Sequence, residues 1–297
     1  MTDVLLSTEE IGHIGLPLLH RGKVREVFDL GDRLLLVASD RLSAFDVVFA
    51  EGIPGKGRVL TELSALWFRA TAPIAPNHFV SMDLSELGLP REAEAQLAGR
   101  SRIVKKTRRV EVECVVRGYL AGSGWKEYQR DGTVCGIPLP PGLELNSPLP
   151  EPIFTPALKV DDGHDENVPY EKVVELYGPE TAAFLRDTSI RLYEFAAAKA
   201  AEAGIILADT KLEFGRLGDE IIVIDELFTP DSSRFWPRDR YVAGRPIDSL
   251  DKQPVRDYLE SIGWNKEPPP PALPEEVAAA CAARYREALE RLRAVLR

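Results

Sequence analysis

The sequence predicts an α+β protein of two lobes, with a mostly antiparallel first lobe and a mixed α/β second lobe. Three observations lead to this expectation. Short apolar runs bounded by turn residues recur up to about residue 120, a proline-rich stretch follows, and helical periodicity is clearest after it. A chain of 297 residues is long enough for a substantial core. We expect the first lobe to span residues 1–112 and the second residues 113–297.

The first lobe contains two predicted strand pairs and one predicted helix. Residues 22–39 are expected to form a hairpin, because Asp-Leu-Gly-Asp supplies a turn between two alternating runs. Residues 55–71 have helical spacing, with Leu60 and Trp67 on one apolar stripe. Residues 101–120 are expected to form a second strand pair.

The second lobe begins with an irregular stretch and continues with helices. Residues 136–169 are rich in proline, and a structureless segment of this length is usually a functional loop or a linker. Two helices are predicted over residues 170–177 and 179–203, and a final helix over residues 274–296. We interpret the final helix as a packing helix because its apolar residues fall along one side. They are Val277, Cys281, Tyr285, Leu289, Leu292 and Leu296.

Composition restricts the classes of function. The formal net charge of −10 argues against non-specific nucleic-acid binding, although it permits a local basic groove for a small anionic substrate. Cys114, Cys135 and Cys281 lie far apart, so neither a disulfide framework nor a zinc site is expected. No signal peptide and no membrane-spanning run is visible, and we expect a soluble cytoplasmic protein.

An unusual charge pattern lies in the strand predicted over residues 205–214. Asp209, Lys211 and Glu213 alternate, so a strand directs all three side chains to one face. Neighbouring carboxylates repel each other unless a cation lies between them. Lys211 can neutralise one of them, and a hard cation such as Mg²⁺ can take the rest. The alternative is a surface hairpin whose charges only pair with Lys211.

The next strand, residues 220–226, follows across a turn and is expected to pair with the first. An even register would group Leu212 and Phe214 with Ile222 and Ile224 on an apolar face. The same register would bring Asp225 to the charged face.

Candidate anion sites occur elsewhere in the chain. Gly22 precedes Lys23 and Arg25, which share one strand face, and such a glycine lets backbone approach a phosphate. Six cations in residues 100–109 suggest a solvated strand face or one edge of a nucleotide cleft, where Lys105 would lie. An ordinary charged hairpin is the alternative for the Gly22 segment.

A second group of residues suits a phosphate monoester. Arg117 is followed by Gly122 and Ser123 at the start of a predicted helix, which combines a cation, a hydroxyl and free amides. Asp231 and Arg234, in a Thr-Pro-Asp-Ser-Ser-Arg run, suit an anion or a sugar hydroxyl. Capped turns are the alternative at both places.

Taken together, these stretches resemble the SAICAR synthetase family of purine biosynthesis (phosphoribosylaminoimidazole-succinocarboxamide synthetase). The matching segments run in family order from about residue 20 to residue 237. They include RGKVREVF, SDRLSAFDVVF, VECVVRGYLAGSGWKEY, LADTKLEFG and DELFTPDSSRFW. The resemblance implies a kinase-like or ATP-grasp-like pair of lobes with a nucleotide between them.

The resemblance also implies the reaction and its participants. The substrates would be ATP, L-aspartate and the carboxylated aminoimidazole ribonucleotide CAIR, with Mg²⁺ as the metal. The products would be the succinocarboxamide SAICAR, ADP and phosphate, formed through an acyl phosphate. The implied metal ligands are Glu213 and Asp225. The implied nucleotide-binding residues are Gly22, Lys23, Val24, Arg25 and Lys105.

The remaining implied residues bind or orient the other substrates. Arg117, Asp209 and Lys211 are the expected catalytic residues. Those expected to contact substrate are Ser43, Arg117, Gly122, Ser123, His164, Asp209, Lys211, Asp231 and Arg234. We expect a monomer or a small homo-oligomer that binds neither nucleic acid nor membrane.

Three other functions fit parts of the sequence. A different ATP-dependent ligase or kinase would differ in the substrates needed for ADP release. A non-catalytic nucleotide sensor would need no metal ligands, so Glu213 and Asp225 argue against it. An RNA-binding module would show salt-dependent affinity for oligonucleotides, which the acidic net charge disfavours.

Overall fold

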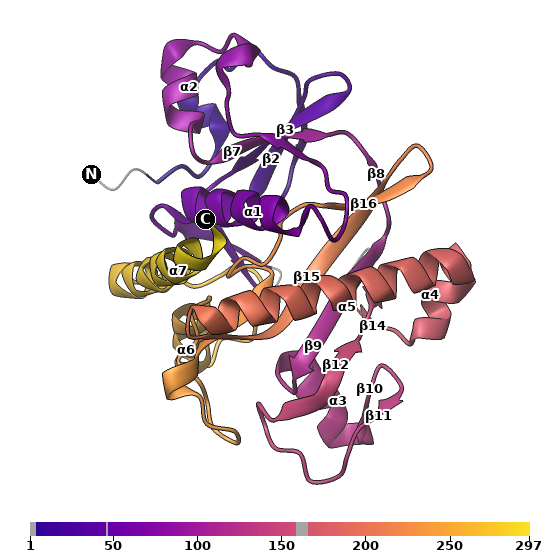
Figure 1. Cartoon of the computed structure of the whole chain (residues 1–297). Coiled ribbons are helices and arrows are strands. Elements are labelled where there is room, and N and C mark those ends of the chain that lie inside the picture. Colours follow the sequence, from indigo (N-terminus) through magenta and orange to yellow (C-terminus); the bar gives the residue numbers. More distant parts are fainter. Residues whose placement is uncertain (1–3, 46, 159–165) are drawn as a thin grey trace.

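The computed structural model describes residues 4–45, 47–158 and 166–297, and its two largest sheets are antiparallel (Figure 1). The first sheet has the order β1-β2-β3-β7-β6. Its β2–β3 hairpin, with Val27 opposite Leu36, confirms the hairpin predicted over residues 22–39. The strands are β1 (Leu18–Arg21), β2 (Arg25–Asp29), β3 (Arg33–Ala38), β6 (Phe79–Ser81) and β7 (Ser101–Lys105). A separate pair consists of β4 (Arg41–Ala44) and β5 (Val47–Gly52).

The second sheet is built around β15 (Ile205–Leu217), a long strand that pairs with four others. These partners are β8 (Arg108–Arg109), β9 (Val112–Tyr119), β16 (Glu220–Ile224) and β17 (Ser233–Pro237). Outside β9 lie β12 (Pro148–Phe154), β13 (Ala157–Leu158) and β14 (Glu166–Asn167). A small pair, β10 (Thr133–Val134) and β11 (Ile137–Pro138), lies apart from this sheet.

Two predictions about strands were wrong. Residues 101–120 do not form a strand pair, because β7 joins the first sheet and β9 the second. The proline-rich stretch 136–169 is not structureless, since β12 pairs with β9. Proline cannot donate to a strand ladder, and β12 accommodates its prolines with a register shift between Pro148 and Ile153.

The helices follow the predicted periodicity closely. Those predicted over residues 55–71, 170–177, 179–203 and 274–296 are confirmed within about one residue at each end. They are α1 (Lys56–Thr71), α4 (Tyr170–Tyr177), α5 (Pro179–Glu202) and α7 (Glu275–Leu296). The shorter helices are α2 (Arg91–Leu97), α3 (Gly122–Asp131) and α6 (Gln253–Ser261). Single 3₁₀ turns cover Thr8–Ile11, Ser85–Leu87 and Arg238–Arg240.

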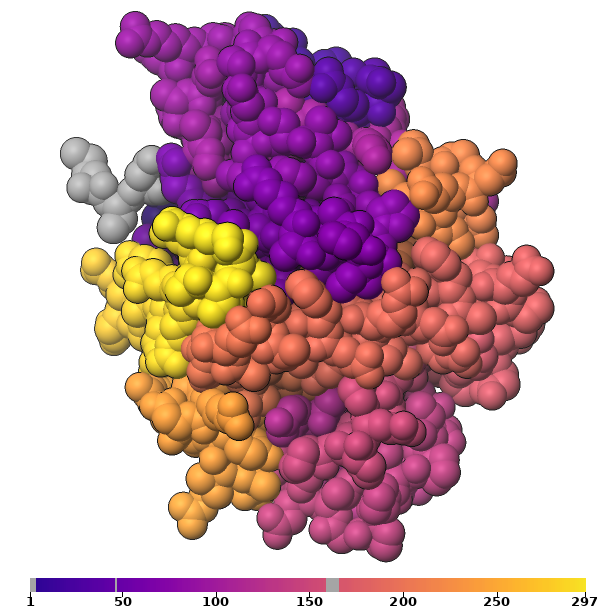
Figure 2. Space-filling view, in the orientation of Figure 1, coloured from indigo at the N-terminus to yellow at the C-terminus, as the bar shows by residue number. Residues whose placement is uncertain are grey.

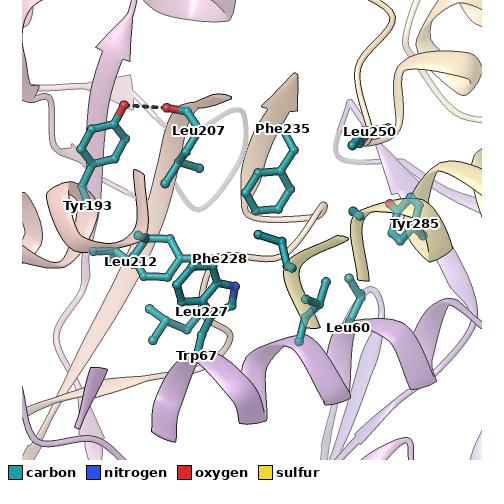
Figure 3. Close-up of a cluster of buried hydrophobic side chains, with 14 of the residues drawn as sticks. Leu60, Trp67, Tyr193, Leu207, Leu212, Leu227, Phe228, Phe235, Leu250 and Tyr285 are labelled. Atoms are coloured by element: carbon teal, nitrogen blue, oxygen red, sulfur yellow. Dashed lines mark hydrogen bonds between the residues drawn. The ribbon is translucent and has the colours of Figure 1, made fainter. Parts of the chain in front are cut away.

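The main core joins the helices to the second sheet. Trp67 of α1 packs edge-on against Phe228, with ring centroids 5.1 Å apart, and both side chains are buried. Figure 3 shows Tyr193 near one end of this cluster and Tyr285 of α7 near the other. In Figure 2, α7 fills the angle between α1 and α5. Over the described residues, no helix combines the length and apolar character needed to span a bilayer.

Candidate active site

A cleft of about 950 Å³ is lined by residues from both sheets. Val27 and Lys105 come from the first sheet, whereas Lys211 and Glu213 come from the second. Eight Lys or Arg residues and five Asp or Glu residues line this cleft, although the whole chain carries a formal charge of −10. The cleft is therefore the local basic groove that a small anionic substrate requires.

One part of the cleft is apolar. Its lining includes Val24, Val27, Leu34, Leu36, Val104 and Ile224. Beside this apolar wall, the Gly22 amide donates to the Arg25 carbonyl at 2.8 Å, which closes a tight turn. Arg41 supports the turn by donating to the carbonyls of Gly22 and Lys23, each at 2.9 Å. An apolar wall beside a turn that carries Lys23 suits a base with its phosphates.

The charged face of β15 surrounds Lys211 with carboxylates. The Nζ atom of Lys211 lies 2.7 Å from Glu113 Oε1 of β9 and 3.0 Å from Glu213 Oε1. Burial lowers the pKa of Lys211, but the charges of Glu213 and Glu113 outweigh this effect and raise the pKa overall. Lys211 therefore remains a cation at neutral pH.

Asp225 reaches this cluster by a route that differs from the prediction. The observed register pairs Glu213 with Ile224 and Phe214 with Val223, so the predicted even register was wrong. Ile222, Val223 and Ile224 are all buried, so both faces of β16 are covered at this end of the strand, one of them beside the cleft. Burial therefore could not identify the register. Asp225 follows the strand with a left-handed φ of 67°, which lets its side chain line the cleft.

Arg25 binds Asp225 through two contacts. Its Nη1 and Nη2 atoms lie 2.6 Å and 2.8 Å from the Asp225 carboxylate, and Nη2 is 3.3 Å from Glu226 Oε1. Burial raises the pKa of Asp225, but the charges of Arg25 and Lys211 lower it overall. Arg25, which we predicted to contact phosphate, thus also connects the Gly22 turn to a predicted metal ligand.

The donor set of the cleft suits a hard divalent cation that is shared with a ligand. Glu213 and Asp225 both line the cleft and supply carboxylate oxygens, which Mg²⁺ prefers. Within the described part of the chain, no group of three or more His, Cys, Asp or Glu side chains is placed to hold a metal ion. A site that takes one or two carboxylates from the protein and the rest from phosphates fits this arrangement.

A second network lies at the other end of the charged face. The Arg117 guanidinium donates to Thr155 Oγ1 at 3.0 Å, to Asp209 Oδ2 at 3.2 Å and to Ser123 Oγ at 2.9 Å. Arg234 donates to the same oxygen of Asp209. Both contacts to Asp209 follow from strand pairing, since Arg117 of β9 and Arg234 of β17 lie opposite Asp209.

Gly122 is required by this network. Its φ is 57°, and a Cβ atom there would lie 2.2 Å from Arg234 Nη2. Any other residue would displace the guanidinium. The glycine that opens α3 thus leaves room for the Arg234 guanidinium, and the next residue, Ser123, is exposed.

The structure brings most of the predicted residues together. Those that line the cleft are Gly22, Lys23, Val24, Arg25, Ser43, Lys105, Lys211, Glu213, Asp225, Asp231 and Arg234. Arg117, Gly122, Ser123 and Asp209 instead connect to the cleft through Arg234. His164 lies outside the described residues.

Several residues that line the cleft were not predicted from the sequence. Lys252 and Arg256 line the cleft beside Ser43, and Lys252 donates to the Ser43 carbonyl at 3.2 Å. Glu113, which contacts Lys211, was also missed. Glu113 could have been predicted, because it lies four residues before Arg117 on the same strand, a spacing that directs both side chains to one face. By contrast, nothing in the local pattern distinguishes Lys252 from an ordinary surface lysine.

Comparisons with known proteins agree on one family. A profile of the SAICAR synthetase family matches residues 18–271. The chain is 55% identical over 280 residues to a phosphoribosylaminoimidazole-succinocarboxamide synthase from Pelobacter propionicus, covering 94% of this chain and 95% of the relative. It is 50% identical over 296 residues to the synthase of the same name from Geobacter sulfurreducens, covering 98% of each.

Solved structures show the same likeness. A SAICAR synthase from Saccharomyces cerevisiae complexed with SAICAR superposes with a TM-score of 0.85 at 40% identity, covering 93% of this chain and 94% of that one. A SAICAR synthetase in complex with ADP superposes with a TM-score of 0.68 at 26% identity, covering 92% and 96%.

Proposed function

Because this chain belongs to the SAICAR synthetase family, we propose that it uses ATP to join CAIR to L-aspartate, forming SAICAR, ADP and phosphate. The family membership confirms the resemblance of the motifs. Members of the family are ligases of purine biosynthesis. The ADP and SAICAR bound in the two related structures support a nucleotide and a ribonucleotide as ligands of this chain.

ATP would occupy the part of the cleft nearest the first sheet. The apolar wall that includes Val27 and Leu36 suits the adenine ring. The turn at Gly22 would cover the phosphates, with Lys23 and Lys105 opposing their charge. Glu213 and Asp225 would hold Mg²⁺, which when bound offsets the negative charge of the phosphates.

CAIR would place its phosphate at the Arg117–Arg234 network. Two guanidinium groups share the single carboxylate of Asp209, so the network has an excess of positive charge. The Ser123 hydroxyl and the amides at the start of α3 add hydrogen-bond donors. A phosphate monoester supplies the charge and acceptors that this network lacks.

The proposed chemistry activates the carboxylate of CAIR. A carboxylate oxygen attacks the γ-phosphorus of ATP, the bond to the bridging oxygen breaks, and ADP leaves. The amine of aspartate then attacks the acyl carbon, loses a proton, and displaces inorganic phosphate. Lys23, Arg25 and Lys211 oppose the charge of the transferring group, and positioning supplies most of the catalysis.

One observation carries this proposal: the carboxylates of residues 213 and 225 and the turn at Gly22 line the same cleft. The test uses CAIR with an ¹⁸O-labelled carboxylate, together with ATP and aspartate. We expect one labelled oxygen in each inorganic phosphate released, because the attacking oxygen leaves with phosphorus. Unlabelled phosphate with normal SAICAR formation would exclude the acyl phosphate. Omitting each substrate in turn should abolish ADP release.

A further inference from the structure

The carboxylate of Asp231 is enclosed by side chains from three separate segments. Lys56 of α1 places its Nζ atom 3.1 Å from Oδ2, and Lys252 places its Nζ atom 3.6 Å from Oδ1. The Tyr285 hydroxyl, from α7, donates to Oδ1. Asp231 follows β16 and precedes β17, so helices from both ends of the chain converge on one loop of the second sheet.

This enclosure reaches the cleft through Lys252. Asp231 and Lys252 both line the cleft, whereas Lys56 and Tyr285 are fully buried behind them. The Lys252 ammonium is also fixed by the Ser43 carbonyl at 3.2 Å. Its side chain is 15% exposed against 6% for Asp231, so the ammonium is the group of this cluster that is most open to a ligand.

Of the three described side chains that contact the Asp231 carboxylate, only Tyr285 is uncharged. Burial raises the pKa of Asp231, but the charges of Lys252 and Lys56 lower it overall, so the carboxylate stays ionised. The two lysines contact different oxygens of the Asp231 carboxylate, Lys56 at Oδ2 and Lys252 at Oδ1. The phenol fixes Oδ1, the oxygen nearer Lys252, because a hydrogen bond is more directional than an ion pair.

We infer that Tyr285 is a positioning residue of the active site, which makes α7 part of the catalytic machinery and not only a packing helix. Through Asp231, Tyr285 holds the Lys252 ammonium where it meets a carboxylate of CAIR or of L-aspartate. This inference rests on the proposed function. It assigns a role to a helix that begins after residue 271, where the match to the family profile ends.

The test is Tyr285→Phe, which removes the hydroxyl and keeps the buried ring. Tyr241→Phe is the matched control, because its hydroxyl donates to the Asn146 carbonyl at 2.7 Å and the residue does not line the cleft. In Tyr285→Phe we expect KM for CAIR or L-aspartate to rise about tenfold, while KM for ATP changes by less than about twofold. Tyr241→Phe should leave all three KM values unchanged.

A double variant tests whether Tyr285 affects KM through Asp231. If Tyr285 acts through Asp231, adding Tyr285→Phe to Asp231→Asn should change KM by less than about twofold. Melting curves ensure that each variant is assayed while folded. Unchanged KM values in Tyr285→Phe, or effects that add fully to those of Asp231→Asn, would overturn the inference. Failure of the wild-type protein to form SAICAR would instead contradict the proposed function.

Discussion

The two ends of the charged face of β15 have the same arrangement of charges with opposite signs. At one end, the carboxylate of Asp209 lies between the guanidinium groups of Arg117 and Arg234. At the other end, the ammonium of Lys211 lies between the carboxylates of Glu113 and Glu213. Only one residue, Thr210, separates Asp209 from Lys211, yet one end has an excess of positive charge and the other an excess of negative charge.

The neighbouring strands, and not β15 alone, determine the charge at each end. Strand β9 supplies Arg117 to the first end and Glu113 to the second. A buried cluster with unbalanced charge is costly unless a ligand of opposite sign completes it. Under the proposed function, a phosphate would complete the arginine end and Mg²⁺ would complete the carboxylate end.

The largest effect should come from breaking the carboxylate end. We expect Glu213→Gln or Asp225→Asn to lower kcat by about 10²–10³-fold, because charge on the transferring phosphoryl is no longer offset. KM for CAIR should change little. Steady-state assays at several Mg²⁺ concentrations measure both quantities, with exposed Glu220→Gln on the same hairpin as the control. Near-normal activity at limiting Mg²⁺ would show that these carboxylates only form ion pairs.

A smaller effect should come from breaking the arginine end. In Arg117→Ala we expect KM for CAIR to rise by the equivalent of about 1.5–3 kcal/mol, because a charged hydrogen bond to phosphate is lost. KM for ATP should stay nearly constant. The melting temperature should also fall, since Arg117 is buried against Asp209 and Thr155. Exposed Arg238→Ala is the control, and equal changes in both KM values would mean that the phosphate site is misplaced.

The sequence predicted the alternation on β15 because strand geometry alone directs Asp209, Lys211 and Glu213 to one face. It did not predict how Asp225 arrives there. Register arguments assume one buried face, whereas the core and the cleft between them bury both faces at the end of β16, and a left-handed residue then redirects the Asp225 side chain. Aspartate tolerates this backbone conformation better than most residues, but the residue type alone does not show which aspartate adopts it.

The contacts that two distant helices make with Asp231 could not be predicted from the sequence either. Lys56 and Tyr285 belong to α1 and α7, 229 positions apart in the sequence, and each fits an ordinary helical pattern. Only the packing of α1 against α7 brings them to Asp231. Arg117 was predicted to bind phosphate from its motif, but its burial against Asp209 depends on the pairing of β9 with β15.

The opposite charge of the two ends is tested most directly by diffraction at the manganese absorption edge. Crystals would be grown with Mn²⁺ in place of Mg²⁺, together with ADP and CAIR. We predict an anomalous peak within bonding distance of the Glu213 and Asp225 carboxylates, and the CAIR phosphate in contact with Arg234 and Ser123. Manganese bound at Asp209, or the CAIR phosphate bound at Lys211, would contradict this account.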